Sequence, residues 1–102
     1  MFGCGGVGLS AIMADAVAGA TTVIGVDTRP DRLEPARELG ATHTVAAGSE
    51  DAAARLASLT GHGAHYSLET TAHSKALALA VDCVSPRCAL GLGARRPPPE
   101  RD

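Results

Sequence analysis

Residues 1–8 of the chain read Met-Phe-Gly-Cys-Gly-Gly-Val-Gly, and this stretch decides the fold. Gly3, Gly5 and Gly8 satisfy the pattern G-x-G-x-x-G. The pattern alone is a weak signal, because a chain with 12 glycines produces chance matches. Its context strengthens it: an Ala-rich stretch with apolar residues at helical spacing follows, and then the β-branched segment 21–26.

The β-branched segment leads directly into Asp27, nineteen residues after Gly8. A glycine-rich turn, a helix, a strand and an acid about 20 residues further on are the fingerprint of a dinucleotide-binding fold. In that fold Gly3 permits the tight turn, Gly5 lets the backbone approach a pyrophosphate, and Gly8 lets helix and strand pack closely. The free N–H groups and partial positive charge at the helix start suit an anion.

The cofactor preference depends on the charges around Asp27. Its carboxylate can accept hydrogen bonds from both ribose hydroxyls and would repel a 2′-phosphate, which favours NAD over NADP. Arg29 and Arg32 keep NADP open, because an arginine near this acid can serve a 2′-phosphate, although Arg32 can also stack on adenine. The alternative is a glycine-rich turn and a surface acid that bind nothing.

Beyond residue 27, helix-like and strand-like segments continue to alternate. Strands are predicted at residues 1–2, 21–26, 43–45, 65–69 and 88–93, and helices at 9–18, 30–39, 50–59 and 74–84. This order predicts an α/β fold, a doubly wound parallel sheet of about five strands with helices on both faces. Two residues are short for a first strand, so we expect an incomplete fold. Pro35 is expected to cost its helix about 3 kcal/mol, and Pro86 to end the last helix.

Length and composition exclude several classes of protein. The 102 residues suffice for one domain, expected at 1–94, with a Pro- and Arg-rich tail at 95–102. No apolar run is long enough for a membrane span, and no secretory leader is recognisable. Nine basic against eleven acidic residues give no footprint for nucleic acid. Three scattered cysteines, Cys4, Cys83 and Cys88, fit a reducing cytoplasm and lack the spacing of a zinc site.

Three segments together resemble the coenzyme domain of zinc-dependent medium-chain alcohol dehydrogenases. They are FGCGGVGLSAI from residue 2, TTVIGVDTRPDRLEPARELGATHTV from residue 21, and HYSLETTA from residue 65. The resemblance covers residues 1–94, and the SLETT stretch is most similar to the aryl-alcohol branch. It implies a Rossmann fold and reversible hydride transfer between an alcohol and NAD.

The resemblance also implies which residues contact the cofactor. Gly5, Gly6 and Val7 match the positions that contact the pyrophosphate in the family. Asp27 matches the acid that binds the adenosine ribose, and Arg32 matches a basic residue beside the adenosine.

The nicotinamide side of the site is less complete in this sequence. Thr70 matches a residue that lines the coenzyme cleft, while Leu92, Gly93 and Ala94 match the loop that touches the nicotinamide carboxamide. The zinc ligands and proton relay of the family have no counterpart here, so neither catalytic residues nor a metal site are expected. Cys4 is interpreted as a small loop residue in preference to a reactive thiol.

Three functions remain open at this point. The chain is the NAD-binding part of an alcohol dehydrogenase-type oxidoreductase, a non-catalytic nucleotide-binding module, or a non-functional gene fragment. NAD is the expected partner, with a small alcohol or aldehyde as substrate only in a full-length protein. A cytoplasmic location and a homo-oligomer are further expectations.

Overall fold

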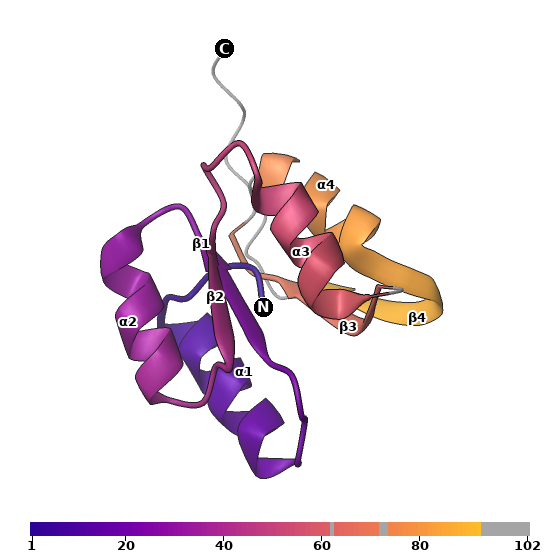
Figure 1. The fold of residues 1–102 in the computed structure, drawn as a ribbon. Coiled ribbons are helices and arrows are strands. Elements are labelled where there is room, and N and C mark those ends of the chain that lie inside the picture. The colour runs from indigo at the N-terminus through magenta and orange to yellow at the C-terminus, as the bar shows by residue number, and fades with distance from the viewer. Residues whose placement is uncertain (62, 72–73, 93–102) are drawn as a thin grey trace.

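The computed structural model describes residues 1–61, 63–71 and 74–92. Helices and strands alternate along the chain in the order α1 (Gly6–Val17), β1 (Ile24–Asp27), α2 (Pro30–Glu38), β2 (His43–Ala46), α3 (Ala52–Thr60), β3 (Ala64–Glu69), α4 (Ser74–Cys83) and β4 (Val84–Leu92). Helices α1 and α2 lie on one side of β1 and β2, and α3 and α4 lie on the other (Figure 1). This is the α/β arrangement that the sequence predicts.

Phe2 joins two pairs of parallel strands into one sheet. Strand β1 pairs with β2, and β3 pairs with β4, both in parallel. Phe2 forms parallel bridges to Val26 on one side and to Glu69 on the other. The order across the sheet is therefore β2, β1, Phe2, β3, β4, and the expected first strand consists of Phe2 alone.

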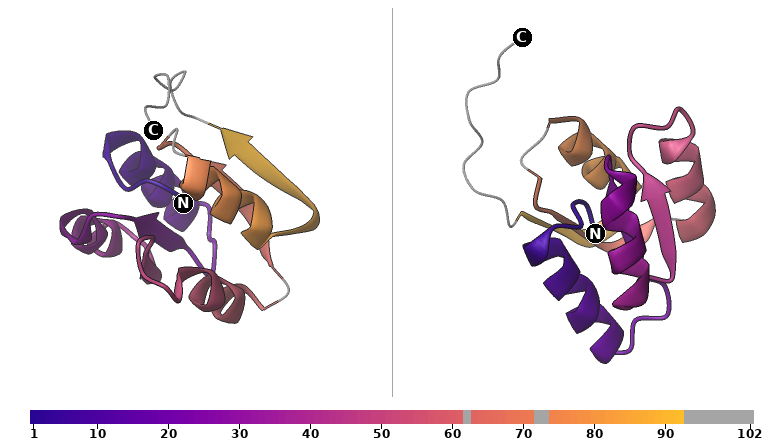
Figure 2. Two further views of the ribbon diagram at one scale, coloured as in Figure 1. Left: turned by 90° about the horizontal axis from the view of Figure 1, so that it is seen from above. Right: turned by 90° about the vertical axis from the view of Figure 1, so that its left-hand side faces the viewer.

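Two buried clusters lie on opposite faces of this sheet. One comprises Phe2, Val26, Val45, Ala52, Leu56 and Ala80, and it packs α3 and α4 against the strands. The other comprises Cys4, Ile12, Val23, Ala36 and Ala41, and it packs α1 and α2. Successive residues of a strand point to opposite faces, so Val26 belongs to the first cluster while its neighbour Gly25 faces the second. In Figure 2 (right) β2 is seen between α2 and α3.

Small residues allow α1 and α2 to approach the sheet closely. A Cβ on Gly25 would lie 3.2 Å from the Cys4 sulfur, 3.3 Å from the Ala36 Cβ and 3.5 Å from the Ile12 Cδ1. Any larger side chain at Gly25 would push these groups apart, at a typical cost of about 1–3 kcal/mol. The small side chains of an Ala- and Gly-rich sequence thus allow short distances between the helices and the sheet.

Element boundaries differ from the predictions at two places near the amino terminus. Helix α1 begins at Gly6 and not at residue 9, because the glycine motif itself forms the first helical turn. Strand β1 begins at Ile24 and not at residue 21. The Thr42 hydroxyl accepts a hydrogen bond from the Val23 amide at 2.9 Å and donates to the Val23 carbonyl at 3.1 Å, so a side chain pairs with this residue just before the strand.

The predicted helix 74–84 ends one residue early, before Pro86, and the strand predicted at 88–93 begins four residues early. Helix α4 ends at Cys83, and β4 begins at Val84 and continues through residue 86. Proline is tolerated there because it lies in the irregular segment between the pairs Ala64↔Val84 and Tyr66↔Ala89, where the strand backbone makes no regular ladder pair. Pro35 does lie inside α2, and the helix continues past it, with the Leu39 amide bonded to the Pro35 carbonyl at 3.0 Å.

None of the described helices has the length and apolar character needed to cross a membrane. The predictions for Gly93, Ala94 and the tail 95–102 fall outside the described residues.

Candidate functional site

The glycine loop makes a turn that only glycine can form at two of its positions. Gly3 has a φ of +102°, and a Cβ there would lie 2.5 Å from the Thr70 hydroxyl oxygen. A Cβ on Gly8 would lie 1.7 Å from the Gly3 carbonyl oxygen, a backbone atom that has no freedom to move aside. Gly3 therefore forms the tight turn and Gly8 the close contact, as the sequence predicts.

The remaining glycines of the motif leave the start of α1 open. Gly5 is the N-cap residue and supplies no side-chain hydrogen bond to the helix. Gly6 is exposed, and a Cβ on it would meet nothing within 4 Å. The first amides of a helix have no intrahelical acceptor, so the N–H groups from Gly6 to Gly8 carry the positive end of the helix dipole. Val7 lies in this turn with its side chain exposed.

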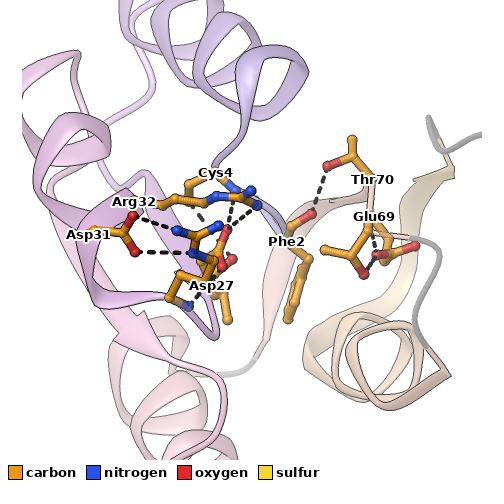
Figure 3. Close-up of polar contacts among 10 residues, drawn as sticks. Phe2, Cys4, Asp27, Asp31, Arg32, Glu69 and Thr70 are labelled. Atoms are coloured by element: carbon orange, nitrogen blue, oxygen red, sulfur yellow. Dashed lines mark hydrogen bonds and ion pairs between the residues drawn. The ribbon is translucent and has the colours of Figure 1, made fainter.

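Asp27 lies beside this loop at the carboxyl end of β1, with only 6% of its surface exposed. One carboxylate oxygen accepts the Cys4 amide at 2.9 Å, and the other accepts the Arg29 amide at 2.9 Å. The Arg32 guanidinium lies 3.8 Å from the oxygen that Cys4 contacts. Figure 3 shows Asp27, Cys4 and Arg32 gathered on one side of Phe2. The acid is thus bound to the loop and carries a cation next to it.

The two arginines that follow Asp27 have different surroundings. Arg29 pairs with Asp31 at 3.0 Å, and both side chains are well exposed. Arg32, in the first turn of α2, extends toward the loop, and its Nη1 lies 4.0 Å from the position of a Cβ on Gly5. Of the two, Arg32 is the arginine positioned over the glycine loop.

Thr70 and Glu69 lie on the other side of Phe2 (Figure 3). The amide and the hydroxyl of Thr70 both donate to the Phe2 carbonyl at 3.0 Å. Glu69 is buried, and its Oε1 accepts the Thr71 amide at 2.6 Å and the Thr71 hydroxyl. These bonds fix Thr70 directly against Gly3, at the same edge of the sheet as Asp27.

The structure brings together most of the residues predicted for the site. The loop glycines, Asp27, Arg32 and Thr70 lie along the carboxyl edge of the sheet. Leu92 lies at the same edge, because β4 pairs it with Glu69, and Gly93 is outside the described residues. Sequence reasoning missed the bond from the Cys4 amide to Asp27, since nothing in the pattern indicates which backbone N–H a carboxylate will accept.

The Cys4 thiol is not activated by its place in the loop. It is buried, and burial together with the nearby Asp27 charge raises the pKa of the thiol. Cys4 Sγ lies 3.8 Å from the Val26 carbonyl oxygen. This environment disfavours the thiolate, so the residue is suited to packing. Within residues 1–61, 63–71 and 74–92, no three His, Cys, Asp or Glu side chains are grouped to hold a metal ion.

Comparison with known families identifies relatives of this sequence. The sequence model of a family described as "Zinc-binding dehydrogenase" matches residues 6–96. The geraniol dehydrogenase of Castellaniella defragrans is 37% identical over 93 residues, which cover 90% of this chain and 25% of that protein. Alcohol dehydrogenase 1 of Zea mays is 38% identical over 86 residues, covering 82% of this chain and 23% of that protein.

Solved structures show the same arrangement. An alcohol dehydrogenase zinc-binding domain protein from Burkholderia ambifaria superposes with a TM-score of 0.87 at 40% identity, over 99% of this chain and 28% of that one. The benzyl alcohol dehydrogenase of Acinetobacter calcoaceticus gives a TM-score of 0.86 at 36% identity, over 93% of this chain and 26% of that one. The chain thus spans about a quarter of the length of the relatives it matches.

Proposed function

Because this chain belongs to the zinc-binding dehydrogenase family, we propose that its glycine loop and Asp27 hold the dinucleotide NAD. The matched part of the family is the NAD-binding part of zinc-dependent alcohol dehydrogenases. The observation that carries the residue assignment is the bond between the Cys4 amide and Asp27, because it fixes the loop and the acid at one edge of the sheet.

The pyrophosphate is assigned to the start of α1. Gly5, Gly6 and Val7 present backbone there without a side chain that covers it, since a Cβ on Gly6 would meet nothing and Val7 is turned outward. Gly3 and Gly8 are assigned a structural role, because they shape the turn. An anion at this position gains the helix N–H groups and the dipole.

The adenosine ribose is assigned to Asp27, whose carboxylate retains lone pairs beyond the two that accept amides. A 2′-phosphate placed there would face this negative charge, which favours NAD over NADP. Arg32 lies beside the same carboxylate and is assigned to the adenosine. The nicotinamide end is assigned to Thr70, Leu92 and Gly93 along the carboxyl ends of β3 and β4.

In a full-length protein we assign this part to an oxidoreductase in which NAD takes a hydride from an alcohol, and we place it in the cytoplasm as a homo-oligomer. Residues 1–94 would form the domain and 95–102 a tail outside it. The residues described here bind and orient the cofactor; they supply no zinc ligand and no proton donor to the substrate. Orientation and electrostatics are the contributions a protein makes to cofactor chemistry of this kind.

Calorimetric titration with NAD tests the assignment. The variant Gly5→Asp places a carboxylate where the pyrophosphate is expected. It should still fold, because aspartate is a favoured N-cap residue and Gly5 has an ordinary φ of −79°. We expect affinity for NAD to fall at least about tenfold, from charge repulsion at close range.

The matched control is Ala14→Asp, which adds the same charge on the exposed face of α1. Its affinity should stay close to that of the parent chain. Equal affinity of Gly5→Asp and the parent would overturn the pyrophosphate assignment. Absence of saturable binding by the parent at millimolar NAD would overturn the proposal for this chain.

A further inference from the structure

A two-point ion pair joins Arg29 to Asp31 at the start of α2. Arg29 is the N-cap residue of this helix, and Asp31 lies in its first turn. The Arg29 Nε donates to Asp31 Oδ1 at 3.2 Å, and its Nη2 donates to Asp31 Oδ2 at 3.0 Å. Two parallel bonds fix the direction of a guanidinium as well as its position. The Arg29 side chain is therefore directed at Asp31.

The backbone of Arg29 lies against the carboxylate to which we assign the adenosine ribose. The Arg29 amide donates to Asp27 Oδ1 at 2.9 Å. Figure 3 shows Asp31 on the same side of Phe2 as Asp27. A long side chain that starts beside Asp27 can reach either Asp31 or a ligand group on the ribose, and in the structure it takes the first of these directions.

The charges around the assigned ribose position are balanced in pairs. The Arg32 guanidinium lies 3.8 Å from Asp27 Oδ2, and the Arg29 guanidinium pairs with Asp31. A phosphate monoester carries close to two negative charges at neutral pH. Such a group on the ribose would meet two arginines that each already have an acid beside them. An uncharged ribose hydroxyl does not need a free cation.

We propose that Asp31 is a positioning residue that sets cofactor specificity: by holding Arg29, it lowers the affinity for NADP without changing the affinity for NAD. This inference rests on the proposed function, because it requires the adenosine ribose to lie beside Asp27. Asp27 repels a 2′-phosphate directly. Asp31 acts through Arg29, whose planar fork of N–H donors would otherwise bind the phosphate at two points.

Asp31 also has a structural role that the test must separate from this one. A carboxylate in the first turn of a helix interacts favourably with the helix dipole, and Asp31 lies in the first turn of α2. Loss of that interaction would lower the stability of the chain, but it would not distinguish one cofactor from the other. The ratio of the affinities for NADP and NAD is therefore the measurement that identifies the specificity role.

The test is a calorimetric titration of the 102-residue chain and its variants with NAD and with NADP. Asp31→Ala removes both acceptor oxygens and places a good helix former at an exposed position. We expect its affinity for NADP to rise about three- to fivefold, the size of effect that an exposed ion pair with two-point geometry can have. Its affinity for NAD should stay within about twofold of the parent value. Asp31→Glu keeps a carboxylate and should retain the parent ratio.

Two further variants separate the release of Arg29 from the loss of a negative charge. Glu34→Ala removes the same charge from an exposed position on the same helix, and it should change the ratio by less than about twofold. The double variant Arg29→Gln/Asp31→Ala lacks the released guanidinium. It should lose the gain in NADP affinity that Asp31→Ala shows.

Each contrary result has a definite meaning. If the parent binds NAD and Asp31→Ala leaves the ratio unchanged, the specificity role is wrong and the proposed function stands. A gain that persists in the double variant, or an equal gain in Glu34→Ala, would also overturn the role, because neither depends on the pair of Arg29 with Asp31. A parent chain that binds no NAD would overturn both the proposed function and this inference.

Discussion

Asp27 and Glu69 occupy matching places on either side of Phe2, and their carboxylates have different partners. Both residues end a parallel strand and are buried, with 6% and 2% of their surfaces exposed. Both strands bridge to Phe2, through Val26 and through Glu69 itself. Position in the sheet therefore does not by itself determine what a buried acid does.

The difference lies in how far along the chain each carboxylate reaches. Asp27 accepts an amide from Cys4, 23 residues away, and so ties the glycine loop to the end of β1. Glu69 accepts the amide and hydroxyl of Thr71, two residues further on, and so closes the turn after β3. Asp27 thus holds a loop formed by a distant segment, while the bonds from Thr71 to Glu69 lie within one local turn.

The largest expected effect on stability comes from disrupting the glycine loop that Asp27 holds. In Gly8→Ala the new Cβ would lie 1.7 Å from the Gly3 carbonyl, so the loop and α1 must separate. We expect the free energy of unfolding in urea to fall by more than about 3 kcal/mol. Gly6→Ala is the matched control and should change stability by no more than about 1 kcal/mol, since a Cβ there meets nothing. Similar losses in both variants would contradict the close contact.

The isosteric pair Asp27→Asn and Glu69→Gln tests the comparison directly. The two Asp27 oxygens each accept an N–H, so the side-chain amide nitrogen of the substituted asparagine would oppose a donor, at a cost of about 2 kcal/mol. Glu69 receives both Thr71 bonds on one oxygen, which glutamine retains, so these two bonds should contribute no loss. Urea unfolding measures both changes.

The same pair should differ in NAD binding. Asp27→Asn is expected to lower the affinity for NAD at least about tenfold, because it disturbs both the loop and the assigned ribose contact. Glu69→Gln should leave the affinity within about twofold. If the two variants lost NAD affinity equally, the distinction between the loop acid and the turn acid would be wrong.

A smaller effect is expected from the arginines beside Asp27. Arg32→Gln removes the guanidinium that lies near the Asp27 carboxylate and the glycine loop. It should lower the affinity for NAD about two- to fivefold. Its effect on stability should stay below about 1 kcal/mol, because the Arg32 side chain is 44% exposed. Arg29→Gln is the control, since its partner Asp31 is exposed and away from the loop. A larger loss of affinity in Arg29→Gln would reassign the adenosine contact.

The smallest effect concerns Cys4 at alkaline pH. Its folded pKa is raised, so the unfolded thiol ionises first as the pH rises above about 8.5. The thiol thus contributes to stability at lower pH, and that contribution is lost above this value. Stability of the parent chain should therefore fall more steeply with pH than that of Cys4→Ala, measured between pH 7.5 and 10 by urea unfolding. Parallel profiles would contradict the raised pKa.

Much of the glycine loop was predictable because its constraints are local. A φ of +102° at Gly3 and a contact of Gly8 with the Gly3 carbonyl follow from a pattern whose spacing leaves few geometries. The strand order was predictable for a similar reason, since alternating strands and helices allow few topologies. The position of Asp27 next to the loop followed from both.

Features that depend on distant partners were not predictable. The start of β1 is set by a Thr42 hydroxyl that pairs with Val23, and the course of β4 through Pro86 depends on which strand lies beside it. The cavity lined by Ile24, Leu56 and Tyr66 could not be predicted either, because it depends on how β1 and β3 are placed around Phe2. A sequence pattern indicates whether a segment is a helix or a strand. It carries little information on the residue at which pairing between two strands stops.

The position of Phe2 between the two strand pairs also affects the order in which the sheet can form during synthesis. The Phe2 carbonyl is synthesised well before Thr70, its hydrogen-bond partner, which lies 68 residues later in the chain. Loops of that length close slowly compared with the local pairing of β1 with β2. Strands β1 and β2 can therefore pair before β3 has been made, and the two strand pairs become one sheet only afterwards.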